Sequence, residues 1–176
     1  MTRLAASYRD PSGHVYVVDG RVLRTVLAPG VADYEFVRDC GLSRRLTERG
    51  WLIHATERPV DSLAVEGPAP AYVLEHPRLA IQSYPYEWSF PALKDAALLQ
   101  LDIHLEALKA GVTLSDASAY NIMFDGPRPV FIDYLSFRRY RDGEFWAGRG
   151  RFEEASGTVR QREPSDEAWR RIRFMV

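Results

Sequence analysis

The sequence is poor in cysteine and lysine and has no long apolar run, and each shortage excludes a class of protein. The single cysteine, Cys40, excludes an internal disulfide and a cysteine zinc cluster, which fits a reducing compartment. No apolar run reaches the roughly 18 residues of a membrane helix, and no early run resembles a signal peptide. The net charge of -1 gives no general attraction to nucleic acid or anionic lipid. We therefore expect a cytoplasmic protein with no nucleic-acid and no membrane partner.

Hydrophobic residues make up 46% of the 176 positions, which is enough for one compact core. Two β-favouring runs, 14–18 and 21–27, flank Asp19-Gly20 and predict a hairpin. Pro29-Gly30 is expected to break the second of these strands. Helical spacing over 31–40 and 42–49 then predicts one helix interrupted near Gly41, or two short helices. Further strands are predicted at 51–53, 71–74 and 79–83, the last two as a pair around His76-Pro77.

The strongest predicted helix runs from Phe90 to Ala110, with Ser89 as its cap and Gly111 as its stop. Its expected buried face carries five apolar side chains at helical spacing: Leu93, Ala97, Leu101, Leu105 and Leu108. His104 on this helix has no second metal ligand nearby in sequence, so we expect a packed or solvated histidine.

Three polar residues stand in the apolar stretch that follows this helix: Asp116, Asn121 and Asp133. The short runs 122–124 and 130–132, joined by Asp-Gly-Pro-Arg-Pro, predict a second hairpin. Antiparallel pairing would bring Asn121 and Asp133 to one end of the ribbon, within reach of a single divalent cation. An alternative stays open, in which all three side chains only serve local backbone hydrogen bonds.

The pattern Asp-x-x-x-x-Asn, followed by an apolar hairpin and an Asp, resembles the protein-kinase and aminoglycoside-phosphotransferase superfamily. The resemblance implies that Asp116 accepts the substrate proton and that Asn121 and Asp133 hold Mg²⁺ on the phosphates of ATP. Leu114 and Ser115 replace the residues usual before the loop Asp, and Tyr-Leu follows Asp133 where Phe-Gly is usual.

The same resemblance implies a strand lysine that holds phosphate and a helix glutamate that pairs with it. No lysine precedes Lys94, so Arg24 is the candidate replacement and Glu35 its partner, the two forming the expected cofactor-binding pair. A planar guanidinium contacts phosphate differently from an ammonium group. The alternative is an ordinary surface ion pair. Gly13 and Gly20 are too isolated to form a glycine-rich phosphate loop.

Segments 83–90, 93–99, 116–121 and 129–133 also resemble the N-terminal region of bacterial SAM-dependent methyltransferases, some of them related to nodulation proteins. The similarity runs from about Tyr8 to Trp146. In that family a methyltransferase domain follows this region. Here the dense glycine pair Gly148-Arg-Gly150 follows no apolar strand, which argues against SAM binding by this chain alone.

We therefore predict an α+β, protein-kinase-like fold with two lobes. The β-rich N-lobe would span 1–88, a truncated helical C-lobe 89–146 and a divergent tail 147–176, with a short helix at 165–175. The predicted function is Mg²⁺ and nucleotide binding, with phosphotransfer left open. The alternative is a non-catalytic accessory or substrate-recognition domain of a SAM-dependent methyltransferase system, whose partner would be a methyltransferase domain.

Overall fold

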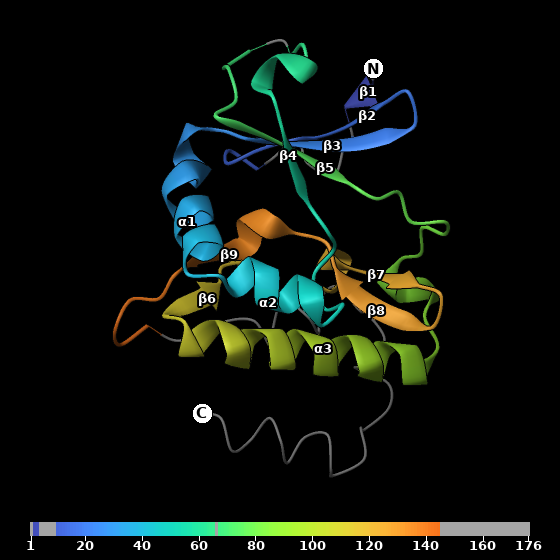
Figure 1. The fold of residues 1–176 in the computed structure, drawn as a ribbon. Coiled ribbons are helices and arrows are strands. Elements are labelled where there is room, and N and C mark those ends of the chain that lie inside the picture. Colours follow the sequence, from blue (N-terminus) through green and yellow to red (C-terminus); the bar gives the residue numbers. More distant parts are fainter. Residues whose placement is uncertain (1, 4–9, 66, 145–176) are drawn as a thin grey trace.

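The computed structural model describes residues 2–3, 10–65 and 67–144, which form an α+β fold (Figure 1). A five-stranded antiparallel sheet, of strand order β1-β2-β3-β5-β4, lies above the helices in the view of Figure 1. Its strands are β1 (Thr2–Arg3), β2 (Val15–Val18), β3 (Arg21–Val26), β4 (Thr56–Arg58) and β5 (Tyr72–His76). The first predicted hairpin is confirmed, since Asp19 and Gly20 both adopt the positive φ of a tight turn between β2 and β3.

The two faces of this sheet have different environments because side chains alternate along a strand. Leu23 and Val73 belong to a small cluster on one face. Arg24 and its cross-strand partner Leu74 lie on the opposite face, and Leu74 belongs to the main core. The sheet therefore directs Arg24 toward the rest of the protein.

Two helices follow β3, namely α1 (Ala28–Asp39) and α2 (Leu42–Glu48). The expected end of the strand before Pro29-Gly30 is confirmed, since β3 ends at Val26. The helix begins earlier than expected, at Ala28, because Pro29 lies in the first turn of α1, where a missing N–H costs no helical hydrogen bond. The predicted interruption at Gly41 is confirmed. Its φ of 73° places it in the left-handed region that suits glycine.

The lower part of the fold combines α3 (Phe90–Lys109) with two small sheets. Strand β6 (Val112–Leu114) pairs with β9 (Phe137–Arg139), and β7 (Ile122–Asp125) pairs with β8 (Arg128–Phe131). Single 3-10 turns complete the elements of the described residues: η2 (Val60–Ser62), η3 (Pro85–Glu87), η4 (Ala119–Asn121) and η5 (Tyr134–Ser136). The second predicted hairpin and the long helix are thus confirmed.

Some expected details of these elements are wrong. The strand at 51–53 is only a single bridge between Leu52 and Phe131. No strand forms at 79–83, because β5 pairs with β3 and β4 instead. The buried face of α3 differs from the expected one and consists of Leu93, Ala96, Leu99, Gln100, Ile103, His104 and Ala107. Leucines surround much of this helix, and the face with small alanines is the one that packs. The packed interpretation of His104 is confirmed.

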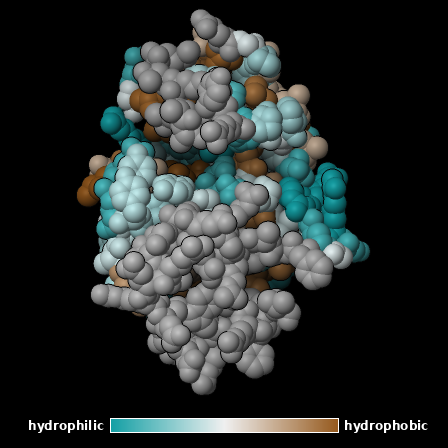
Figure 2. All heavy atoms as spheres, turned by 180° about the vertical axis from the view of Figure 1, so that it is seen from behind, coloured by the Kyte–Doolittle hydropathy of each residue, from teal (hydrophilic) through white to brown (hydrophobic). Residues whose placement is uncertain are grey.

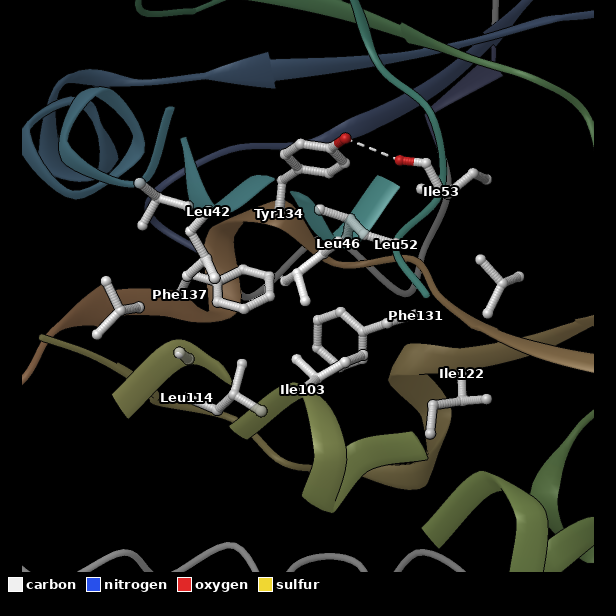
Figure 3. Packing of buried hydrophobic residues seen from close by; sticks show 14 of the residues in the cluster. Leu42, Leu46, Leu52, Ile53, Ile103, Leu114, Ile122, Phe131, Tyr134 and Phe137 are labelled. Atoms are coloured by element: carbon white, nitrogen blue, oxygen red, sulfur yellow. Dashed lines mark hydrogen bonds between the residues drawn. The ribbon is translucent and has the colours of Figure 1, made fainter. Parts of the chain in front are cut away.

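One main core joins the sheet, the three helices and the small strands. Figure 3 shows Phe131 and Phe137 between Leu42 and Leu46 of α2 and Ile103 of α3. The rear face in Figure 2 shows hydrophilic residues along both flanks of its middle and hydrophobic ones between them. Among the described residues, no helix has both the length and the apolar character to cross a bilayer. The predicted tail 147–176 and its helix lie outside the described residues.

Candidate functional site

The β7–β8 hairpin brings Asn121 and Asp133 to one end, as the sequence predicts. Ile122 pairs with Phe131, so the residues just outside the ladder lie next to each other. The Ile132 N–H donates to the Asn121 carbonyl oxygen at 2.8 Å and continues the pairing by one step. The two residues proposed as metal ligands are therefore held by backbone geometry.

A buried hydroxyl, Ser136 Oγ, joins the two side chains. It donates to Asp133 Oδ2 at 2.5 Å and accepts from Asn121 Nδ2 at 3.3 Å. Ser136 is 2% exposed and ends turn η5, three residues after Asp133. Ser136 was not among the residues predicted from the sequence, because a serine three residues after an Asp carries no signal without the turn that folds it back.

Asp116 enters the same network through its backbone. Its carbonyl oxygen accepts from Asn121 Nδ2 at 3.3 Å, while its carboxylate oxygen Oδ1 accepts from the Ser118 N–H at 3.0 Å. Asp133 Oδ1 likewise accepts from the Leu135 N–H at 3.1 Å. The alternative of local backbone hydrogen bonding is thus realised at both aspartates, and the network unites the three predicted residues at the same time.

The guanidinium of Arg24 reaches this network from the sheet. Its Nη1 forms an ion pair with Asp133 Oδ1, and the two side chains are only 11% and 17% exposed. The predicted pairing of Arg24 with Glu35 is wrong. Glu35 accepts from the Tyr72 hydroxyl at 2.6 Å instead, because β5 places that tyrosine opposite α1. The alternative of an ordinary surface ion pair is also wrong, because the Arg24 side chain is mostly buried.

The charge of Asp133 is stabilised where it lies. Burial alone would raise its pKa, but the Arg24 charge and the hydrogen bonds from Ser136 and Leu135 outweigh burial and hold the pKa below its usual value. The carboxylate therefore stays ionised at neutral pH, which is the form that binds a cation.

A neutral histidine, His76, lies next to the Arg24–Asp133 pair. His76 lies on the Arg24 face of the sheet and its ring contacts that of Tyr134, with centroids 5.4 Å apart. Its Nδ1 lies 2.9 Å from the His54 carbonyl oxygen, and Nε2 has no hydrogen-bond partner within the part of the chain that the structure describes. Burial lowers the pKa of His76 to about 4, so the ring adds no charge at neutral pH.

The donor atoms fit a hard cation such as Mg²⁺. The hydrogen bonds of the Asn121 side chain to Asp116 and Ser136 use its Nδ2, so Oδ1 is the atom of this side chain that would bind a cation. An ionised carboxylate offers about four lone pairs, and three donors on Asp133 leave one of them on Oδ2. Mg²⁺ commonly uses one or two protein ligands together with phosphate and water. The described residues contain no cluster of three His, Cys, Asp or Glu side chains that would bind a metal without such help.

The fold and the site define an α+β protein in which a strand arginine and a hairpin amide and carboxylate converge on one point. No protein-family model matches the chain. The chain is similar to the nodulation protein NoeA of Rhizobium meliloti (strain 1021), with 43% identity over 150 residues. These residues are 85% of this chain and 31% of NoeA, so the chain spans about a third of the length of that relative.

Proposed function

We propose that this chain is a kinase-like domain that binds a Mg²⁺–nucleotide complex, with Asn121 and Asp133 as protein ligands of the cation. One observation carries the proposal, namely the convergence of Arg24 from a sheet strand with Asp133 from the β8 end. A buried cation and anion that share a hydrogen-bond network with the Asn121 amide suit a ligand with both a metal and phosphates.

Each residue has a defined part in this proposal. Mg²⁺, when bound, supplies positive charge that neutralises nucleotide phosphates. Asn121 would present its amide oxygen and Asp133 its remaining lone pair to the cation. Arg24, whose planar guanidinium suits phosphate oxygens, would contact the phosphates, while Glu35 is assigned to support of Tyr72.

The order of elements supports a kinase-like, two-lobe arrangement. A sheet with the two helices α1 and α2 precedes a long helix, a polar loop and a hairpin that is followed by Asp133. Asp116 follows β6 and would serve as the proton acceptor if the domain transfers phosphate. Its backbone carbonyl is fixed by Asn121, which relates the loop to the metal site.

A second candidate function is that of a non-catalytic accessory domain in a methyltransferase system related to nodulation. The similarity to NoeA favours it, because the matched region is only 31% of a longer protein. In this case the polar network would be structural and a methyltransferase domain would be the partner. SAM binding is not assigned to this chain.

Thermal unfolding with and without Mg-ATP separates the two candidates. A ligand present at 100 times its Kd stabilises a protein by about 2.7 kcal/mol, which raises the Tm of a domain of this size by roughly 5–10 °C. We expect this shift for the wild type, no shift with EDTA and ATP, and no shift for Asp133→Asn.

The control variant is Asp125→Asn, at the exposed opposite end of the same hairpin. Each shift is taken relative to the unliganded Tm of the same variant, which removes the effect of lost stability. An equal Tm shift with Mg-ATP in Asp133→Asn and Asp125→Asn would mean that the nucleotide binds at a site that does not include Asp133. No shift in the wild type would favour the accessory function.

A further inference from the structure

The Ser136 hydroxyl has a defined direction of hydrogen bonding. A hydroxyl has one proton and two lone pairs, whereas an ionised carboxylate only accepts. The 2.5 Å contact with Asp133 Oδ2 therefore uses the proton of Ser136, in the short range typical of charge-assisted bonds. Asn121 can then approach Ser136 only with its NH₂ group, as the 3.3 Å contact from Nδ2 records.

This direction determines which atom of Asn121 is left for a ligand. The amide nitrogen donates to two acceptors, the Ser136 hydroxyl and the Asp116 carbonyl. A flipped amide would place its oxygen against the lone pairs of both. Because Ser136 donates its one proton to Asp133 and cannot donate it to Asn121, the amide oxygen is kept on the side away from these partners.

The backbone of Ser136 is fixed as firmly as its side chain. Its carbonyl oxygen accepts from the Ser115 N–H at 2.7 Å and from the Ser115 hydroxyl at 3.0 Å. Ser115 precedes Asp116, and these bonds extend the β6–β9 pairing by one residue. Ser136 therefore joins the two loops that carry the three polar residues.

We propose that Ser136 is a positioning residue for the cation site, which it keeps competent by orienting both ligands through one hydroxyl. This inference rests on the proposed function and adds a residue to it. Groups that orient metal ligands typically change metal affinity by about 10–100-fold when they are lost. The expected effect of losing the Ser136 hydroxyl is a fall of about tenfold in cation affinity.

The test is titration of the purified chain with Mn²⁺, followed by electron paramagnetic resonance of the free ion, in the absence of nucleotide. Ser136→Ala removes the hydroxyl, and Ser136→Thr retains it. The matched control is Ser115→Ala, which removes a hydroxyl bonded to the other side of the same residue without touching Asn121 or Asp133.

We expect about tenfold weaker Mn²⁺ binding in Ser136→Ala and at most twofold changes in Ser136→Thr and Ser115→Ala. If Ser136→Ala does not fold, Ser136→Cys keeps a side chain of similar size with a weaker donor, and a severalfold loss is expected there. A purely structural role would lower the Tm of Ser136→Ala and Ser115→Ala alike and leave their Mn²⁺ affinities equal.

Two results would overturn the inference in distinguishable ways. If the wild type binds Mn²⁺ and both Ser136→Ala and Ser136→Cys bind it with the same affinity, Ser136 has no positioning role, and the proposed function still stands. No Mn²⁺ binding by the wild type, together with no Mg-ATP shift, would overturn both.

Discussion

Removal of either partner of the Arg24–Asp133 ion pair should cost several kcal/mol of stability, because the remaining charge would be buried without its partner. The two side chains are 11% and 17% exposed, and removal of one partner from a buried pair typically costs about 3–5 kcal/mol. Asp133 would keep the hydrogen bonds from Ser136 and Leu135 in an Arg24→Met variant. The cost should therefore lie at the lower end, about 3 kcal/mol.

Urea unfolding at pH 7 measures this cost in a double-mutant cycle. Arg24→Met and Asp133→Asn should each lose about 3 kcal/mol, and the double variant should lose little more than either single one. The coupling energy is then about 3 kcal/mol, and each single variant should melt roughly 6–12 °C below the wild type.

The control residue is Arg21, on the same strand as Arg24. Arg21 pairs with Glu75 at 2.7 Å, but its side chain is 46% exposed, and Arg21→Met should cost much less stability than Arg24→Met. Additive losses at Arg24 and Asp133, or losses no larger than that of Arg21→Met, would refute the reasoning. The pair would then be a solvated contact and a weaker basis for the proposed site.

Two further perturbations follow from the same region. Gly13→Ala should lower the free energy of unfolding in urea by more than about 2 kcal/mol. The added Cβ would lie 2.0 Å from the Thr25 carbonyl oxygen and 2.6 Å from Leu135 Cδ1. A loss below about 1 kcal/mol would contradict this packing. The free energy of unfolding should also fall by about 2 kcal/mol between pH 7 and pH 5 because of His76. The pKa of His76 is about 4 in the folded protein and 6.5 ordinarily, so in this pH range only the unfolded chain takes up the proton. His76→Gln should lose that part of the pH dependence, and an unchanged profile would contradict the assignment.

Local chemistry was enough to predict the elements that hold the site. The Asp19-Gly20 turn, the helix beginning at Phe90 and the β7–β8 hairpin depend on turn residues and on spacing within a short stretch of chain. The adjacency of Asn121 and Asp133 followed from the hairpin alone. These predictions succeed because the interactions that determine them are close in sequence.

Contacts between distant segments explain the failures. The partner of Arg24 lies 109 residues away, and only the packing of the sheet on the hairpin brings the two together. Both Asp133 and Glu35 are carboxylates within the same chain, and sequence spacing cannot rank them. The strand predicted at 79–83 fails for the same reason, since β5 finds its partners in β3 and β4.

The Arg24–Asp133 pair also relates the two candidate functions to one another. Three donors already satisfy most of the Asp133 carboxylate, so the network is stable as a purely structural element. The same arrangement leaves one lone pair on Asp133 and the amide oxygen of Asn121 available. A cation that binds there must tolerate the nearby guanidinium, and nucleotide phosphates, which attract both, would offset that repulsion. On this reasoning the cation and the nucleotide should bind more tightly together than either does alone.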